Sequence, residues 1–259
     1  MGTWTDIHAH LADERISADA EAVIVESRRR GVAGILVNAA RVCEWDRVCE
    51  LAAAPGVWGA LGLHPFFAGD WHSGLADDLR ERLCAGPRLA AIGEIGLDFY
   101  DGRENQARQE EVLARQLELA RSLDLPVIVH NRKSWSEFFG LWRDTVEGSI
   151  PGVCHHFTGS REVARQALDK GLFLSFCGPL TYANARRLKE AARYVPLERI
   201  LTETDTPDLP TASHRDEESR PWHVQEIVAE IARLKGMSTA TVAGRVRETF
   251  DALVARPHP

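Results

Sequence analysis

The chain has 259 residues, of which 44% are hydrophobic and 27% charged, and its formal net charge at pH 7 is −7. This composition is typical of a globular protein with an ample core, and the length suits one large α/β domain. The acidic balance argues against a broad basic surface that binds nucleic acid through many phosphates. It still allows a phosphate-containing substrate that metal ions hold in a cleft.

The sequence contains neither a signal-peptide pattern nor an apolar run long enough to span a membrane. Its cysteines are odd in number and include no Cys-x-x-Cys pair, which favours reduced thiols over a disulfide framework. We therefore expect a cytoplasmic protein with no membrane partner, and we take a monomer as the default oligomeric state.

Short apolar runs alternate with amphipathic segments along the whole chain. The apolar runs predict eight strands, at about 3–10, 33–37, 57–62, 89–94, 126–130, 152–155, 172–176 and 199–203. Apolar residues at helical spacing predict helices at about 18–30, 43–54, 73–85, 105–123, 134–146, 160–170, 183–193, 221–235 and 239–254.

Eight short apolar strands that alternate with helices predict an α/β fold, a parallel sheet closed as a (β/α)8 barrel of the TIM type. An open doubly wound sheet is the alternative, but no Gly-x-Gly-x-x-Gly follows the first strand. Since no linker or break in composition interrupts the pattern, we expect residues 1–259 to form a single domain.

The first predicted strand ends in His8-Ala9-His10. Side chains two positions apart on a strand point to the same face, so the two imidazoles are expected to stand side by side. Imidazole nitrogens suit Zn, Mn, Fe, Ni or Cu. The pair is therefore a candidate chelating pair for a metal ion.

Other predicted strands also end in polar residues that can bind metal. These residues are His64, Glu94, His130, His155, His156, Glu203 and Asp205. In a barrel the carboxyl ends of the strands converge on one face, where active sites form. We therefore expect these side chains and the histidine pair to meet there.

Two divalent ions account for this set best. The ligands that we predict are His8, His10 and Asp205 for one ion and His130 and His155 for the other, with Glu94 as the bridge between them. Two such ions can share a hydroxide and clamp the attacking and leaving oxygens of a substrate. Asp205 can also take a proton from the attacking water, so Asp205 and Glu94 are the candidate catalytic residues.

Mg, Mn and Zn are all candidates for these ions, although Mg would be an unusual partner for so many histidines. Glu203 is either a contact to a further ion or a carboxylate of the rim. His64 and Arg132 are candidate substrate contacts through phosphate oxygens, with structural contacts at the rim as the alternative.

The sequence resembles the TatD family of metal-dependent hydrolases, which belong to the amidohydrolase-like barrels. The motifs that carry the resemblance follow one another along nearly the whole chain: His8-Ala9-His10, Gly62-Leu63-His64-Pro65, Gly93-Glu94-Ile95-Gly96-Leu97-Asp98, His130-Asn131-Arg132, His155-His156-Phe157-Thr158-Gly159 and Glu203-Thr204-Asp205-Thr206-Pro207. The resemblance implies the same six metal ligands. It also implies Mg- or Mn-supported deoxyribonuclease activity, mainly 3′-to-5′ exonucleolytic, and some members are described as deacylating D-aminoacyl-tRNA.

Some positions depart from the family pattern or rest on it less securely. His156 stands where many relatives have Cys or Gly, so it is a further possible ligand, and Ser219-Arg220-Pro221 replaces the usual Asn-x-Pro. Arg215 lies in the loop where the family has an arginine on the phosphate side. The aromatic residues that follow His64 offer either base stacking or packing of the core or lid; they are Phe66, Phe67 and Trp71.

The leading hypothesis is a two-metal phosphodiesterase that acts on a DNA end. The second is hydrolysis of an ester or amide, including aminoacyl-tRNA deacylation, because the same hydroxide can attack a carbonyl carbon. The third is a metal-stabilised binding or scaffold protein without catalysis.

Overall fold

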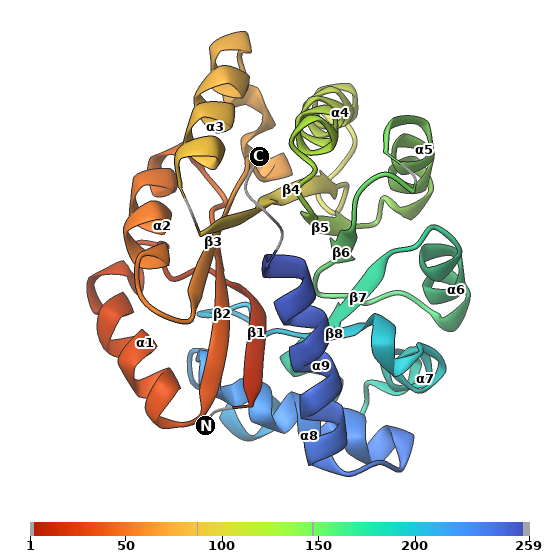
Figure 1. The fold of residues 1–259 in the computed structure, drawn as a ribbon. Helices are drawn as coiled ribbons and strands as arrows, with labels where there is room; N and C mark the ends of the chain where they lie inside the picture. The colour runs from red at the N-terminus through yellow and green to blue at the C-terminus, as the bar shows by residue number, and fades with distance from the viewer. Residues whose placement is uncertain (1–2, 87, 147, 256–259) are drawn as a thin grey trace.

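The computed structural model describes residues 3–86, 88–146 and 148–255. Eight strands form one parallel sheet in chain order, and each strand pairs with the next (Figure 1). They are β1 (Trp4–Ala9), β2 (Val32–Asn38), β3 (Val57–Leu61), β4 (Leu89–Asp98), β5 (Val127–Arg132), β6 (Gly152–Cys154), β7 (Phe173–Phe176) and β8 (Ile200–Thr202). The predicted parallel barrel is confirmed.

Helices follow the strands and surround the sheet (Figure 1). They are α1 (Ala20–Arg29), α2 (Trp45–Ala52), α3 (Ser73–Ala85), α4 (Gln106–Leu123), α5 (Trp135–Thr145), α6 (Arg161–Asp169), α7 (Arg186–Tyr194), α8 (Val224–Lys235) and α9 (Thr239–Val254). Each corresponds to a predicted helix, with shifts of a few residues at the ends. Within the described part of the chain, no helix has both the length and the apolar character that crossing a bilayer requires.

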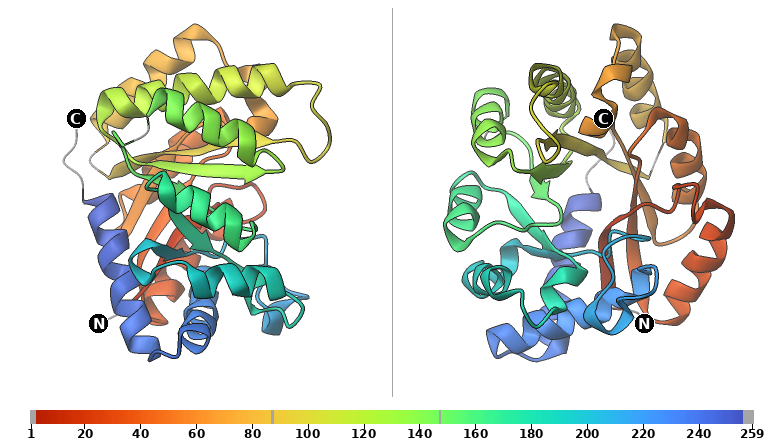
Figure 2. Two further views of the ribbon diagram at one scale, coloured as in Figure 1. Left: turned by 90° about the vertical axis from the view of Figure 1, so that its right-hand side faces the viewer. Right: turned by 180° about the vertical axis from the view of Figure 1, so that it is seen from behind.

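The helix α9 closes one opening of the barrel. Its residues Phe250, Leu253 and Val254 belong to the same buried cluster as side chains from the barrel interior, such as Ile7. Figure 1 shows α9 crossing this opening, and the right panel of Figure 2 shows the opposite opening, where the loops after the strands gather. A Cβ at Gly34 would lie 2.6 Å from the Phe250 ring, so the absence of a side chain at Gly34 leaves room for this residue of α9. The loop end of the barrel remains available for a site.

The seam between β8 and β1 is held differently from the other strand pairs. Among the described residues, its backbone pairing consists of an isolated bridge between Ala9 and Thr206, just beyond β8. The amide of Asp205 donates to the carbonyl of His8 over 3.0 Å, and the amide of His10 donates to the carbonyl of Thr206 over 2.7 Å. The first and last strands of the sheet therefore meet where the candidate metal ligands lie.

Two strands extend further than the sequence pattern predicts. β4 continues to Asp98 and β5 to Arg132, so Glu94 lies inside a strand instead of at its end. The pairing of β4 with β5 shifts register between Ile92 and Ile95. An irregularity of this kind re-aims side chains, and such features are common beside active sites.

Candidate metal centre

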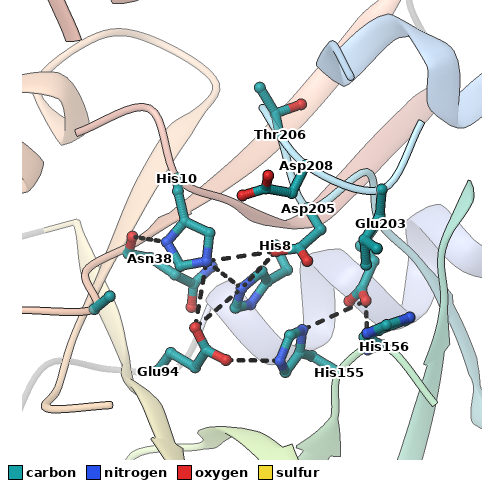
Figure 3. Close-up of polar contacts among 12 residues, drawn as sticks. His8, His10, Asn38, Glu94, His155, His156, Glu203, Asp205, Thr206 and Asp208 are labelled. Carbon is teal, nitrogen blue, oxygen red and sulfur yellow. Dashed lines mark hydrogen bonds and ion pairs between the residues drawn. The ribbon is translucent and has the colours of Figure 1, made fainter. Parts of the chain in front are cut away.

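His8 and His10 form the first half of the centre. Their Nε2 atoms lie 3.0 Å apart at the end of β1. Glu94 Oε2 lies 3.5 Å from the first of these nitrogens and 3.3 Å from the second, and Asp205 Oδ1 lies 3.4 Å from both (Figure 3). A tetrahedral shell with bonds of about 2.1 Å places its ligand atoms about 3.4 Å apart. These four atoms therefore fit the shell of one divalent ion.

The ring of His10 is held in the tautomer that a ligand needs. Its Nδ1 lies 3.1 Å from the carbonyl oxygen of Asn38, which can only accept, so Nδ1 carries the proton and Nε2 is free to bind a cation. Asn38 is fully buried at the end of β2, and its amide nitrogen donates to the carbonyl of Ile7 over 3.3 Å. The neighbouring strand thus orients the histidine.

The second half of the centre gathers around the other oxygen of Glu94. His155 Nε2 lies 2.7 Å and His130 Nδ1 2.9 Å from Glu94 Oε1, and these two nitrogens are 3.2 Å apart. One carboxylate therefore presents Oε2 to the β1 pair and Oε1 to the histidines after β5 and β6. This is the arrangement expected of a carboxylate that bridges two ions.

Asp98 orients the ring of His130. Its Oδ2 lies 2.9 Å from His130 Nε2, while the opposite ring nitrogen faces Glu94. A carboxylate behind a ligating imidazole fixes its tautomer and raises its basicity. This role was not predicted from the sequence, although the position of Asp98 four residues after Glu94 in the same motif was a usable signal.

Asp6 ties together the two chain segments that carry the candidate ligands His8, His10 and Asp205. It is fully buried, and its Oδ1 accepts hydrogen bonds from the amides of His8 and Thr204 over 3.2 and 3.0 Å. Burial raises the pKa of Asp6 to about 8, against the opposing effect of these hydrogen bonds. Its side chain was also missed as a functional one; the signal was a charged residue inside an otherwise apolar strand.

The electrostatics favour deprotonated carboxylates at the centre. Burial on its own would raise the pKa of Glu94, but the imidazoles of His155, His64 and His8 outweigh it and hold that pKa well below its usual range. The pKa of Asp205 is likewise lowered, because the contact with His10 outweighs burial. Anionic carboxylates and imidazole nitrogens are the donor set that a divalent ion requires.

Glu203 and His156 lie beside the second half of the centre. Glu203 is fully buried, its Oε1 accepts a hydrogen bond from the amide of His156, and its Oε2 has no hydrogen-bond partner among the described residues. The same Oε1 lies 3.5 Å from His155 Nδ1. The ring of His156 lies next to Glu203 (Figure 3). His155 is the one of the two neighbouring histidines whose ring nitrogen faces Glu94.

His64 lies against the centre from the end of β3. Its Nδ1 accepts a hydrogen bond from the amide of Phe66 over 3.2 Å, so the proton of the neutral ring is on Nε2, which lies 3.6 Å from Glu94 Oε1. Burial, the largest cause, lowers the pKa of His64 to about 3, so the ring is neutral at pH 7. Its N–H is therefore available as a donor at the edge of the cleft.

Arg132 and Arg215 lie further out. The guanidinium of Arg132 stands 3.5 Å from the centroid of the Tyr100 ring, and its Nη1 lies 4.0 Å from Asp98 Oδ2. Arg215 lies over the ring of Tyr182 at 4.6 Å. Both cations are held on aromatic rings at the rim, and neither approaches Glu94 or Asp205 in the contacts of the described residues.

The loop after β8 is fixed next to Asp205. The buried Ser219 donates from its hydroxyl to the carbonyl of Thr204 over 3.1 Å and from its amide to the carbonyl of Pro207 over 2.9 Å. Asp205 itself adopts a left-handed backbone conformation with φ of 54°. Aspartate tolerates this region better than most residues do. The serine that departs from the family pattern thus helps to hold this turn.

A model of the family described as TatD related DNase matches residues 5–254. The chain belongs to the TatD family. It is a metal-dependent hydrolase of that family, and the resemblance predicted from the motifs is confirmed. The matched region includes residues of all eight strands of the barrel.

Individual TatD relatives match over most of their length. The metal-dependent hydrolase YcfH of Escherichia coli K12, whose name describes it as uncharacterized, is 34% identical over 96% of this chain and 94% of its own. The 3′-5′ ssDNA/RNA exonuclease TatD of Musicola paradisiaca is 34% identical over 93% of each chain. The crystal structure of the TatD homolog YjjV from E. coli superimposes with a TM-score of 0.92 at 28% identity and covers 98% of this chain and 99% of that one.

Proposed function

We propose that the protein is a two-ion phosphodiesterase that removes nucleotides from the 3′ end of single-stranded DNA or RNA. The observation that carries the proposal is the placement of the two carboxylate oxygens of Glu94. One oxygen faces the His8–His10 pair, and the other faces His130 and His155. Relatives named 3′-5′ ssDNA/RNA exonuclease TatD, at 30–34% identity, support the substrate class.

The residues of the cleft divide the work as follows. His8, His10 and Asp205 would hold one ion, His130 and His155 would hold the other, and Glu94 would serve both. Such ions would supply an activated water and positive charge on the phosphate oxygens. Asp205 accepts a proton from the attacking water, whose oxygen forms the new bond to phosphorus, while the P–O3′ bond breaks and the leaving 3′ oxygen takes a proton from solvent. His64 donates its Nε2–H to a phosphate oxygen, and Arg132 contacts a phosphate further from the reacting bond.

The size and charge of the cleft suit a strand end. The cavity lined by His10, His64 and Glu94 has a volume of about 190 Å³, which is small enough to favour a strand end over a long stretch of nucleic acid. The net charge of −7 argues against a broad basic surface of the kind that binds long nucleic acids. When only the terminal nucleotide enters the metal cleft, the rest of the strand stays clear of the acidic protein, so charge repulsion between them is small.

The test is a matrix of metals and substrates on chelator-treated protein. Single-stranded DNA and RNA with a labelled 5′ end are incubated with Mg²⁺, Mn²⁺ or Zn²⁺, and we expect stepwise shortening from the 3′ end with Mg²⁺ or Mn²⁺ and none with EDTA. Asp205→Asn should abolish shortening. Asp216→Asn, an exposed carboxylate in the same loop, is the matched control and should retain it.

D-aminoacyl-tRNA is the second substrate of the matrix, because the same ligand set can activate water toward a carbonyl carbon. Faster deacylation than strand shortening under every metal would replace the phosphodiesterase proposal with ester hydrolysis. Failure of all metals to support strand shortening would refute the proposal outright.

A further inference from the structure

Phe66, in the loop after β3, is a large apolar side chain with more than half of its surface exposed, 56%. Single exposed apolar residues are ordinary, so exposure alone carries little. The position of Phe66 is informative: its ring centroid lies 4.6 Å from that of His64 in an edge-to-face contact and 6.4 Å from that of His130. The exposed ring therefore stands at the mouth of the candidate metal centre.

Phe66 lines two hollows of the surface. One is the metal cleft of about 190 Å³, which it lines together with His10 and Glu94. The other, of about 450 Å³, is lined by Phe66 and by the loop that contains Asp101 and Asn105. A ligand whose phosphate lies in the metal cleft can therefore place an attached ring system against Phe66.

The neighbouring aromatic residues are already engaged. Phe67 packs against the main core, and the guanidinium of Arg41 lies 5.3 Å from its ring centroid. Trp71 is buried in that core. Tyr100 is half exposed, but the cation of Arg132 covers its ring at 3.5 Å. Of the three aromatic residues that follow His64, Phe66 is the one that offers its ring to an incoming group.

The backbone holds Phe66 in place. A short 3-10 helix runs over Pro65–Asp70, and His64 caps it by accepting the amide hydrogen of Phe66 over 3.2 Å. The other nitrogen of the His64 ring lies 3.6 Å from Glu94. Pro65 restricts φ at the first position of the turn. Phe66 is therefore linked to the bridging carboxylate through one rigid residue, which suits a preformed platform.

We propose that Phe66 is a stacking platform for the unpaired nucleobase next to the scissile phosphate. The inference rests on the proposed nuclease function and specifies how that site recognises its substrate. Stacking on an aromatic ring is tolerant of base identity but requires a base free of its duplex partner. It also supplies affinity that does not depend on positive charge, which suits a chain whose net charge is −7. The expected substrate class is a single strand of any sequence with a base near its 3′ end.

The experiment compares two oligonucleotides that differ only in that base. Both are single-stranded DNAs, one with ordinary nucleotides and one whose two 3′-terminal nucleotides are abasic, and shortening is measured with Mn²⁺. Phe66→Ala should raise KM for the ordinary strand roughly 5- to 50-fold and leave KM for the abasic strand unchanged. Phe66→Trp should restore the wild-type value, while Phe66→Leu, apolar but not aromatic, should not.

The matched control is Val25→Ala, which removes another exposed apolar side chain, 63% exposed, from α1. It should leave KM for both strands unchanged. Equal KM values for wild type and Phe66→Ala on the ordinary strand would overturn the platform, and so would an equal rise on both strands, because that result indicates a structural role. A wild-type protein that shortens neither strand would refute the nuclease proposal itself, which is a distinct outcome.

Discussion

Asp6 and Thr204 are joined by two hydrogen bonds across the seam of the barrel. The amide of Thr204 donates to Asp6 Oδ1 over 3.0 Å, and its hydroxyl donates to Oδ2 over 2.5 Å. Because Asp6 also accepts the amide hydrogen of His8, one side chain joins the segment of the β1 histidines to the segment of Asp205. Two backbone hydrogen bonds, from Asp205 to His8 and from His10 to Thr206, cross the seam beside it. The Asp6 contact adds to them and helps to set how the candidate ligands face one another.

We expect Asp6→Ala to weaken metal binding about 10- to 100-fold, the usual effect of losing a group that orients a ligand. Two buried amides lose their acceptor, so the free energy of unfolding should also fall by about 2–4 kcal/mol. Asp6→Asn keeps an oxygen that can accept both amide bonds and should bind metal nearly as tightly as wild type. Competition with a chelating dye measures the affinity, and urea denaturation measures the stability.

The control for this prediction is Thr202→Val. It removes a hydrogen bond from the Thr202 hydroxyl to the carbonyl of Thr5, 3.0 Å long, at the same seam but away from the ligands. We expect lower stability with unchanged metal affinity. If Asp6→Ala and Thr202→Val reduce metal affinity equally, Asp6 has no special role in positioning.

The barrel fold and the candidate metal ligands could be predicted from the sequence, because the strands, the helices and the histidine pair all follow local patterns. Alternating apolar and amphipathic segments specify strands and helices, and a two-residue period places His8 and His10 together. The position of Glu94 was less predictable. Its strand continues for four more residues, and the register shift that re-aims it depends on pairing with β5.

The roles of the supporting residues were harder to predict, because the sequence marks Asp6 and Asp98 as unusual but their partners are remote in the chain. Asp6 and Thr204 are separated by 198 positions, and Asp98 acquires its role from a histidine 32 positions later. The difference between Phe66 and Phe67 depends on one turn of 3-10 helix, which exposes the first ring and buries much of the second. No periodicity in so short a segment separates the two.

Removal of the metal should destabilise the protein in a way that depends on Glu94. An ion that binds only the folded state at 1,000 times its Kd adds about 4 kcal/mol to the free energy of unfolding. Glu94→Gln removes the anionic bridge, so we expect this increment to be largely lost. Urea denaturation with Mn²⁺ and with EDTA gives the increment for each variant. Glu118→Gln, which changes an exposed acidic residue of α4, should keep the wild-type increment, and a full increment in Glu94→Gln would contradict the bridging role.

The fit of α9 into the barrel predicts opposite effects at two glycines. Gly34→Ala places a methyl group 2.6 Å from the ring of the fully buried Phe250, and overpacking of this kind costs about 1–3 kcal/mol. Gly244→Ala lies within α9 with no atom near the added group, so it should stabilise the protein by about 0.5–1 kcal/mol. Urea denaturation distinguishes them, and a stabilised Gly34→Ala would disprove the tight contact.

His223 should make the protein less stable in mild acid. Burial, and then the charge of His214 stacked 3.8 Å away, lower the pKa of His223 to about 4, against about 6.5 for an unfolded histidine. Between these two pH values the unfolded chain takes up a proton that the folded protein excludes, so stability falls as the pH decreases from 6.5 toward 4. At pH 5 the loss attributable to this residue is about 1–2 kcal/mol.

The measurement is the free energy of unfolding from pH 7 to 5 for wild type, His223→Gln and His72→Gln, each saturated with metal. His223→Gln cannot take up the proton, so its pH dependence should be shallower by that amount, even though loss of packing lowers its stability at pH 7. His72 is exposed, and its replacement should leave the slope as in wild type. Parallel curves for wild type and His223→Gln would show that this histidine titrates alike in the folded and unfolded states.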